Sequence, residues 1–219
     1  MKNKFPYILE VNSLNKKFNN KTIISNASFK LKTEQIIGLT GKNGSGKTTL
    51  FKMISGIMHP TSGTGKIKDK QLFGSSFEYR KHLIYWSHYP QFYSSLTGYE
   101  NLELFLNLRS DFDKVRLIND YATMYDLKNQ IFKKISKYSF GQIQRLKLIQ
   151  LSISNWDLAL LDEPHSGIDN DGKKILDHNF DKWSKMGKTI FIISHNKEWL
   201  EKNCDTIFNL ENSELYQND

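Results

Sequence analysis

The sequence has little cysteine and proline and no long hydrophobic run. Its 219 residues include one cysteine, Cys204, and four prolines. A single cysteine excludes an internal disulfide and a zinc site built from several cysteines, and it favours a reducing, cytoplasmic location. The longest apolar runs, such as 158–161 and 190–193, are short, whereas a membrane span needs about 20 apolar residues. The first residues also lack the apolar segment of a secretory signal. We therefore expect neither a span nor a leader.

Acidic residues are scarce relative to basic ones, with 23 Asp and Glu against 31 Lys and Arg and a net charge of +8. Such a charge suits binding to nucleic acid or to an anionic membrane face, but a lysine-rich solvated surface has the same composition. Hydrophobic residues at 38% and charged residues at 25% are typical of a globular chain and exclude wholesale disorder. The length fits one domain, alone or with a modest insertion.

Short apolar segments alternate with segments of helical period. We expect strands at 7–11, 36–40, 158–161 and 189–193, helices at 48–57 and 173–185, a turn-rich strand region at 64–86, a polar stretch at 12–21, and a helical block over 97–150. Strands that are apolar on both faces and alternate with helices indicate a parallel sheet covered on both sides. The sequence therefore predicts an α/β core that is interrupted by a helical block.

A glycine-rich segment follows the expected strand 36–40. Residues 41–48, Gly-Lys-Asn-Gly-Ser-Gly-Lys-Thr, match the pattern G-x-x-x-x-G-K-[ST] between a strand and a helix. The glycines let successive backbone N–H groups face a phosphate, and the helix N-terminus adds a favourable dipole. Lys47 is suited to reach the β- and γ-phosphates, and Thr48 is suited to bind Mg²⁺ through its hydroxyl.

The strand 158–161 ends in two carboxylates, Asp162 and Glu163. Asp162 is suited to hold Mg²⁺, directly or through water. Glu163 is suited to polarise a water for attack on the γ-phosphate. A small-molecule kinase or a GTPase would have the same two parts. The loop and the carboxylates therefore indicate a nucleotide-binding protein without fixing its class.

A third motif narrows the class. Residues 138–145, Tyr-Ser-Phe-Gly-Gln-Ile-Gln-Arg, resemble the signature L-S-G-G-Q-x-Q-R of the ATP-binding cassette (ABC) ATPases, and Ser139 precedes Asp162 by 23 positions, as in the family. In this family the serine hydroxyl and glycine N–H groups form a second anion nest for the γ-phosphate held by another protomer. The resemblance argues against a small-molecule kinase. It implies a dimer in which each cassette supplies half of a site.

Further segments follow in family order over about residues 7–212. Asp169 lies in a loop that resembles the one crossing the dimer interface. His195 resembles the switch histidine, which would bond the γ-phosphate and hold the attacking water with Glu163. Phe18 resembles the aromatic residue that stacks on adenine, although an aromatic residue at this place also suits the core.

The resemblance implies an α/β fold: a P-loop NTPase core with a RecA-like parallel sheet, an N-terminal antiparallel β part and an inserted helical subdomain. One ABC ATPase domain would cover 1–219, with the nucleotide-binding core at about 1–87 and 151–219 and the helical subdomain at about 88–150. The implied ligands are ATP and Mg²⁺. The implied catalytic residues are Glu163, His195 and Lys47, and the implied metal ligands are Thr48 and Asp162. The implied nucleotide contacts are Phe18, Gly41, Asn43, Gly44, Ser45, Gly46, Lys47, Thr48, Thr49, His88, Ser139, Gly141, Gln142 and Asp169.

Two regions depart from the family pattern. Phe140 replaces the first signature glycine and Tyr138 replaces the leucine; the first glycine position varies in the family, so we expect activity to survive. Counting back from residues 96–102, which resemble the family's L-T-x-x-E-N-L, the usual γ-phosphate-sensing glutamine falls on His88, while the nearest glutamine, Gln91, comes three residues later. We favour His88 as the equivalent residue and keep Gln91 as the alternative. The charge of a histidine depends on pH, so its use as a metal ligand is open.

The expected function is that of the ATPase subunit of a membrane transporter. It would work with separate permease subunits at the cytoplasmic face of the cell membrane, as a homodimer or a heterodimer with a second cassette, and without a stable nucleic acid partner. His88 and the short length also resemble the haem-exporter cassettes of cytochrome c maturation. The alternative is a soluble ABC ATPase acting on nucleic acid or ribosomes. An aromatic cluster at 85–93 suits either a groove for a membrane-subunit helix or packing between subdomains.

Overall fold

The computed structural model describes residues 5–89 and 91–218, which separate into two compact units. The α/β unit holds the chain up to Trp86, Trp156–Pro164 and the chain from Phe180, and the helical unit holds Ser87–Asn155 and His165–Asn179. The sequence predicts that residues 165–179 belong to the nucleotide-binding core. This segment belongs to the helical unit because its side chains bond there; the Tyr125 hydroxyl, for example, donates to Oδ1 of Asn179 at 3.0 Å. That one ABC ATPase domain covers the whole chain stays a prediction.

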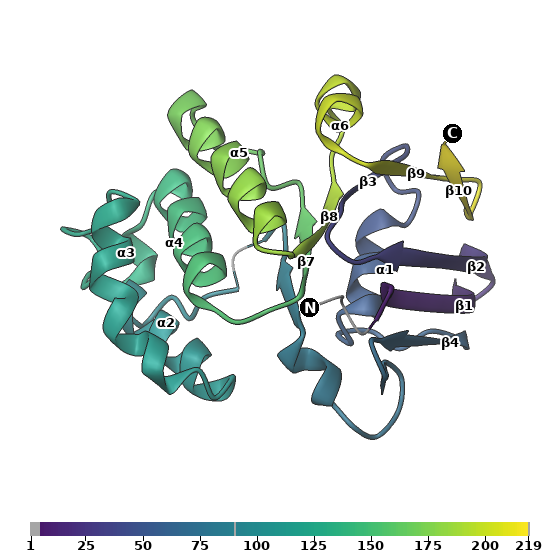
Figure 1. The fold of residues 1–219 in the computed structure, drawn as a ribbon, viewed down its shortest axis with the longest axis horizontal. Coiled ribbons are helices and arrows are strands. Elements are labelled where there is room, and N and C mark those ends of the chain that lie inside the picture. Colours follow the sequence, from purple (N-terminus) through teal and green to yellow (C-terminus); the bar gives the residue numbers. More distant parts are fainter. Residues whose placement is uncertain (1–4, 90, 219) are drawn as a thin grey trace. The chain divides into compact units, whose positions relative to one another are not determined.

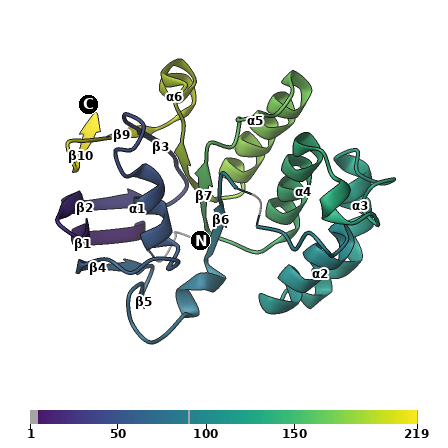
Figure 2. The same cartoon turned by 180° about the vertical axis from the view of Figure 1, so that it is seen from behind.

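A six-stranded sheet forms the centre of the α/β unit, in the order β10-β9-β3-β8-β7-β6 (Figures 1 and 2). Its strands are β3 (Ile36–Thr40), β6 (Leu83–Trp86), β7 (Leu158–Asp162), β8 (Thr189–Ile193), β9 (Thr206–Glu211) and β10 (Glu214–Asn218). The first five pair in parallel, and β10 pairs with β9 in the antiparallel sense. Every residue of β3, β7 and β8 is buried, as parallel strands covered on both faces require. The predicted parallel α/β core is confirmed.

A four-stranded antiparallel sheet completes the β structure of this unit, in the order β2-β1-β4-β5. Its strands are β1 (Tyr7–Phe18), β2 (Lys21–Lys32), β4 (Ser62–Ile67) and β5 (Lys70–Gln71). The predicted strand 7–11 ends too early, because residues 12–18 of the expected polar stretch continue β1 and pair with β2 through several register shifts. Four of these seven residues are exposed, which explains their polar composition.

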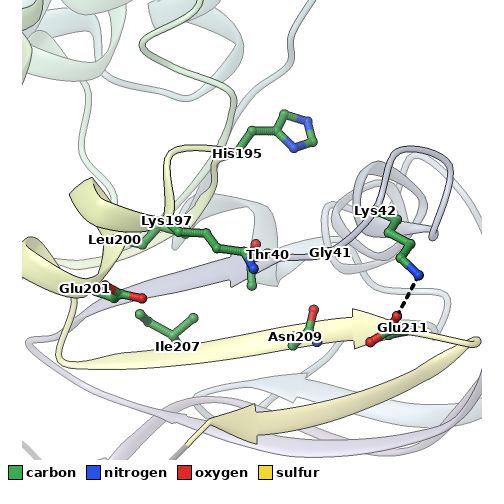
Figure 3. Close-up of a pocket in the computed structure, with 10 residues that line it drawn as sticks. All are labelled: Thr40, Gly41, Lys42, His195, Lys197, Leu200, Glu201, Ile207, Asn209 and Glu211. Carbon is green, nitrogen blue, oxygen red and sulfur yellow. Dashed lines mark ion pairs between the residues drawn. The ribbon is translucent and has the colours of Figure 1, made fainter.

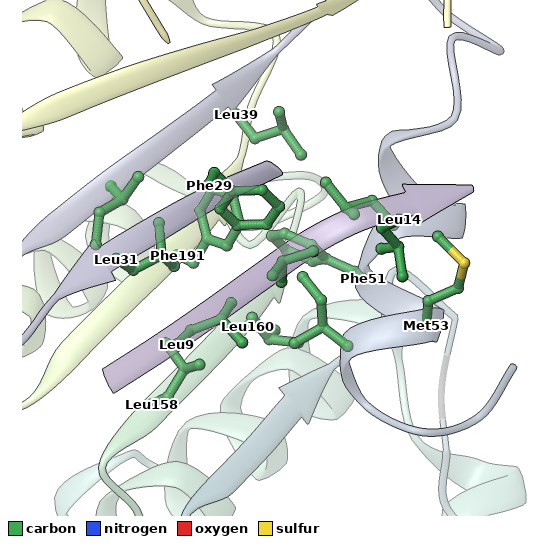
Figure 4. Packing of buried hydrophobic residues seen from close by; sticks show 14 of the residues in the cluster. Leu9, Leu14, Phe29, Leu31, Leu39, Phe51, Met53, Leu158, Leu160 and Phe191 are labelled. Atoms are coloured by element: carbon green, nitrogen blue, oxygen red, sulfur yellow. The ribbon is translucent and has the colours of Figure 1, made fainter. Parts of the chain in front are cut away.

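The hydrophobic core of the α/β unit joins both sheets to helix α1 (Lys47–Ile54) (Figure 4). Phe51 of α1 is fully buried, and its ring lies 4.9 Å from that of Phe191 in β8, measured between centroids. Burial of such a side chain stabilises the fold by about 1.5–3 kcal/mol. Helix α1 ends before Gly56, whose φ is +73°, and so stops earlier than predicted. Because α1 begins at the glycine-rich loop, its burial fixes that loop against the sheet.

The amino ends of β6 and β7 are linked by an ionic cluster. Oδ2 of Asp157 accepts a hydrogen bond from Nζ of Lys68 at 2.8 Å and lies 2.6 Å from Nδ1 of His82. Burial alone would raise the pKa of Asp157, but the hydrogen bonds from Lys68 and His82 outweigh it and lower this pKa below its usual value. The ionised carboxylate therefore contributes to stability.

The helical unit contains α2 (Gly98–Leu108), α3 (Ile118–Met124), α4 (Phe140–Ile153), the first part of α5 (Asn170–Lys185), and the 3₁₀ segments η2 (Phe112–Leu117) and η3 (Ile135–Lys137); the α/β unit adds α6 (Lys197–Asn203) and η1 (Glu78–Lys81). Both α2 and α4 start with a capping box, in which Thr97 pairs with Glu100 and Ser139 with Gln142. These contacts satisfy first-turn N–H groups. Among the helices of the described residues, none has the length and apolar character to span a membrane.

Tyr138, which replaces the signature leucine, packs inside the helical unit. Its hydroxyl donates to the carbonyl oxygen of Gln130 at 2.8 Å, and burial raises its pKa to about 12. A Cβ on Gly98 would lie 2.3 Å from this hydroxyl. Tyr138 therefore fills the space that Gly98 leaves at the start of α2.

Candidate nucleotide-binding site

The glycine-rich loop has the open backbone that its sequence predicts. Gly41, Gly44 and Gly46 adopt φ values of +144°, +77° and +110°, which disfavour residues with a Cβ. At Gly41 a Cβ would also lie 2.3 Å from the carbonyl oxygen of Leu210. Within the described chain, the buried Oγ of Ser45 has no hydrogen-bond partner. A loop with an unsatisfied buried hydroxyl fits an anionic ligand such as a phosphate.

Lys47 lies at the end of this loop and is 6% exposed. Its Nζ donates to the carbonyl oxygens of Gly41 and Lys42 at 2.8 and 2.9 Å. Burial lowers the pKa of Lys47, and the charges of Glu163 and Asp162 oppose this shift. The ammonium is therefore held inside the curl of the loop, beside the acidic strand end.

Thr48 and Asp162 meet as the sequence predicts for a magnesium site. Oγ1 of Thr48 donates to Oδ2 of Asp162 at 2.9 Å, and Asp162 is 2% exposed. A hydroxyl and a carboxylate oxygen at this separation are the ligand types that Mg²⁺ takes, so the residues fit the ion. The hydroxyl of Tyr85 lies 3.5 Å from the same carboxylate oxygen. The sequence placed Tyr85 in an aromatic cluster and did not connect it to Asp162.

Glu163 and His195 form the second pair at this edge of the sheet. Nε2 of His195 lies 3.1 Å from Oε1 of Glu163. Glu163 has a φ of +52°, and its N–H donates to the carbonyl oxygen of Ile193 at 3.1 Å. A left-handed backbone at a residue other than glycine costs energy and is often found at functional sites. The turn after β7 aims Glu163 toward the segment after β8.

A cavity of about 380 Å³ opens beside the start of the loop, between β3, β9 and α6 (Figure 3). Its wall includes Lys42 and Glu211, which form an ion pair at 3.1 Å, and it includes His195. The ion pair joins the second residue of the loop to the end of β9. Sequence motifs missed Glu211 because it lies outside every motif and 169 positions from Lys42.

Phe18 ends β1 and is 45% exposed, so its ring is free to stack on a ligand. Nζ of Lys16 lies 4.9 Å from the centroid of this ring, a cation–π distance. The same ammonium donates to the carbonyl oxygen of His59 at 2.8 Å. Lys16 therefore holds one side of the ring, a role that no sequence motif indicates. Adenine stacking by Phe18 stays a prediction.

Ser139, Gly141 and Gln142 belong to the helical unit, at the N-terminus of α4. The Ser139 hydroxyl accepts the N–H of Gln142 at 3.3 Å, and the Gln142 side chain accepts the N–H of Ser139 at 3.0 Å. A Cβ on Gly141 would meet nothing within 4 Å. Ser139 thus has the geometry of an N-cap, and the open surface at Gly141 leaves the helix end accessible to an anion.

Asp169, His88 and Gln91 also lie in the helical unit. Oδ1 of Asp169 accepts the N–H of Gly172 at 2.7 Å, and Oδ2 lies 3.7 Å from Nη2 of Arg145. The His88 ring lies 5.3 Å from that of Tyr89, while Gln91 is exposed. The choice between His88 and Gln91 stays a prediction.

These features define a nucleotide-binding protein of the P-loop class, and comparison with known proteins identifies its family. The profile of the ABC transporter family matches residues 24–166. The chain belongs to this family. A solved structure described as the ATP binding subunit of an ABC transporter covers 96% of this chain, and the chain covers 89% of it, with a TM-score of 0.89 and 24% identity. That likeness confirms the fold.

Curated relatives share the family. The chain is 35% identical over 202 residues to an uncharacterised ABC transporter ATP-binding protein, YcbN of Bacillus subtilis, with 92% of this chain and 66% of YcbN covered. It is 34% identical over 209 residues to the bacitracin transport ATP-binding protein BcrA of Enterococcus faecalis, with 92% and 65% covered. The chain thus spans just under two thirds of each of these relatives. It is 27% identical over 188 residues to the cytochrome c biogenesis ATP-binding export protein CcmA of Vibrio vulnificus, with 86% and 92% covered.

Proposed function

We propose that this chain binds and hydrolyses ATP and drives transport through membrane subunits on separate chains. The observation that carries the proposal is the convergence of Lys47, Thr48, Asp162, Glu163 and His195 at the carboxyl edge of one parallel sheet. One carboxylate meets the loop hydroxyl, and the other meets an imidazole. These are the parts that phosphoryl transfer to water requires. Membership of the ABC transporter family supports the same conclusion.

Each residue has a role that follows from its chemistry. Lys47 binds the phosphate oxygens through its ammonium, and the loop N–H groups orient them. Thr48 and Asp162 hold Mg²⁺, which supplies neutralisation of the phosphate charge when bound. Glu163 accepts the proton of the attacking water. His195, 3.1 Å from Glu163, orients that carboxylate and donates to the γ-phosphate.

We further propose that activity requires a second cassette, identical or related. The accessible N-terminus of α4 at Ser139 and Gly141 is suited to the γ-phosphate of a nucleotide held by that partner. The assembly would lie at the cytoplasmic face of the cell membrane, against a permease subunit, without a stable nucleic acid partner. The net charge of +8 is the feature that suits the alternative, a soluble cassette acting on ribosomes or nucleic acid. Co-sedimentation with membranes rather than with ribosomes would support the transporter.

The class of cargo is a finer proposal. Identity to the bacitracin transport protein BcrA is 34%, against 27% to the export protein CcmA. A bacitracin-type transporter is therefore tested before a haem exporter. The haem-exporter interpretation stays a prediction that the CcmA likeness supports. Expression of this chain together with a candidate permease subunit, followed by assays of bacitracin resistance and of cytochrome c maturation, distinguishes the two.

The central test is Glu163→Gln. This variant keeps the shape of the side chain but cannot accept a proton, so ATP turnover should fall by about 100-fold or more, while ATP binding persists. With ATP it should also elute as a dimer in size-exclusion chromatography with light scattering. The control Lys47→Ala should lose ATP affinity instead. Undiminished hydrolysis by Glu163→Gln would remove Glu163 from its role.

A further inference from the structure

A buried lysine in the helical unit has no role in the chemistry proposed above. Lys147 lies in α4, eight positions after Ser139, and is 4% exposed. Its neighbours on the helix, Leu146 and Leu148, are buried as well. Removing an ammonium group from water is unfavourable unless its donors are bonded. A lysine at this place therefore calls for a specific partner.

One such partner is the backbone next to His88. Nζ of Lys147 donates to the carbonyl oxygen of Ser87 at 2.7 Å. Ser87 is itself 8% exposed, so its carbonyl needs a bonded donor as much as the ammonium needs an acceptor. Ser87 directly precedes His88, the candidate γ-phosphate-sensing residue. The contact thus ties the start of the His88 segment to α4.

A second anchor holds the far side of the same segment. Asn101 of α2 is 4% exposed. Its Oδ1 accepts the N–H of Tyr93 at 2.8 Å, and its Nδ2 donates to the carbonyl oxygens of Tyr93 and Thr97 at 3.1 and 2.8 Å. Ser87 and Tyr93 are therefore each bonded by a buried polar side chain of the helical unit, on either side of His88 in the sequence.

We propose that Lys147 is a positioning residue that fixes His88 relative to the signature end of α4. The path from Lys147 to Ser139 runs along about 12 Å of one helix, which is rigid. Displacement of the His88 segment would thus be passed to the helix end that carries Ser139 and Gly141. The expected effect on ATP turnover rests on the proposed ATPase function, whereas the hydrogen bond between Lys147 and Ser87 does not.

Amide hydrogen exchange in the nucleotide-free protein tests the tie directly. Lys147→Met keeps the length and packing of the side chain but has no donor. Exchange should rise by about tenfold at 87–89, while the amides of α2 keep their protection. Lys173→Met, at an exposed lysine of α5 in the same unit, is the matched control and should change nothing at 87–89. Unchanged exchange at 87–89 in Lys147→Met would overturn the proposal.

A second variant distinguishes the loss of the Lys147–Ser87 hydrogen bond from a general loss of structure in the helical unit. Lys147→Gln restores an N–H donor on a side chain that is one bond shorter, so it should recover part of the protection at 87–89. Lys147→Met could unfold the helical unit, which would be seen as a loss of helical circular dichroism. In that case the amide exchange rates at 87–89 in Lys147→Gln and in the wild type are compared instead. Slower exchange at 87–89 than in the rest of the helical unit of Lys147→Gln supports the role of the Lys147–Ser87 hydrogen bond. Exchange at 87–89 as fast as in the rest of that unit contradicts it.

Turnover tests the consequence. In Lys147→Met the kcat for ATP should fall by about tenfold, while the Kd for ATP stays within about twofold. The reason is that the glycine-rich loop of residues 41–48, called the phosphate loop below, lies in the α/β unit. A normal kcat together with raised exchange would overturn the positioning role. If wild-type protein hydrolyses no ATP, the proposed function fails, and the exchange result still stands for Lys147.

Discussion

Phe140, which stands in the place of a signature glycine, has a specific counterpart in Gly167. Gly167 has a φ of +67°, and a Cβ built on it would lie 2.1 Å from Cε1 and 2.5 Å from Cδ1 of Phe140. Gly167→Ala therefore has two costs. The left-handed backbone costs alanine about 1–2 kcal/mol. Displacing the ring adds about 1 kcal/mol, at the low end of overpacking, because Phe140 is 44% exposed and has room to move.

A double-mutant cycle separates the two costs. Gly167→Ala alone should lower the free energy of unfolding by about 2–3 kcal/mol. Phe140→Ala alone should cost about 1 kcal/mol, because only part of the ring is buried. In the double variant the steric cost is absent, so the loss should be about 2–3 kcal/mol rather than the additive 3–4 kcal/mol. The expected coupling between the two residues is therefore about 1 kcal/mol.

The measurement is urea unfolding followed by far-ultraviolet circular dichroism. Tryptophan fluorescence is unsuitable, because the four tryptophans, Trp86, Trp156, Trp183 and Trp199, all lie in the α/β unit. Losses that add to within about 0.3 kcal/mol would show that Phe140 and Gly167 do not touch in solution. The contact between the signature and the loop of Asp169 would then have to be abandoned.

Three further predictions follow from the site and the ionic cluster. Asp157→Asn should lower the free energy of unfolding by about 1 kcal/mol at pH 7, discounted for its partial exposure. The lowered pKa of Asp157 makes this contribution present above the unfolded pKa of about 3.9 and lost as the pH falls through the folded pKa, so urea titrations at decreasing pH should show the two proteins converging. Thr48→Val should weaken ATP binding with Mg²⁺, while affinity without Mg²⁺ stays within about twofold. His88→Ala should lower ATP turnover by about tenfold and Gln91→Ala should not; the reverse result would transfer the role to Gln91.

The fold was predictable where burial is complete on both faces. The runs at 158–161 and 189–193 became β7 and β8 because a strand in the middle of a parallel sheet has no polar face. The second half of β1 was missed because one face of an antiparallel strand meets water, and its register shifts break the alternation that sequence patterns depend on. Strands were therefore predictable from the sequence where their pattern of buried residues is regular, whatever their length.

The site residues were predictable where they lie close together in the sequence and form one local motif. The phosphate loop and the acidic strand end are local motifs, so their geometry follows from a turn or a strand terminus. The contacts of Glu211 with Lys42 and of Lys147 with Ser87 join distant segments, and no local pattern encodes them. One signal existed for Lys147, since it lies between two leucines, Leu146 and Leu148, and a charged residue within an apolar run indicates a buried polar contact.

The division of the site residues between two units makes binding and turnover separable. Phe18, the phosphate loop, Asp162, Glu163 and His195 lie in the α/β unit, and the signature and His88 lie in the helical unit. ATP affinity of the isolated chain should therefore respond to substitutions in the α/β unit, whereas turnover should respond to both. Variants of the helical unit that keep their fold provide the critical comparison. A loss of ATP affinity in such a variant would mean that the helical unit itself binds the chain's own nucleotide, and the phosphate loop would then be one part of a larger binding site.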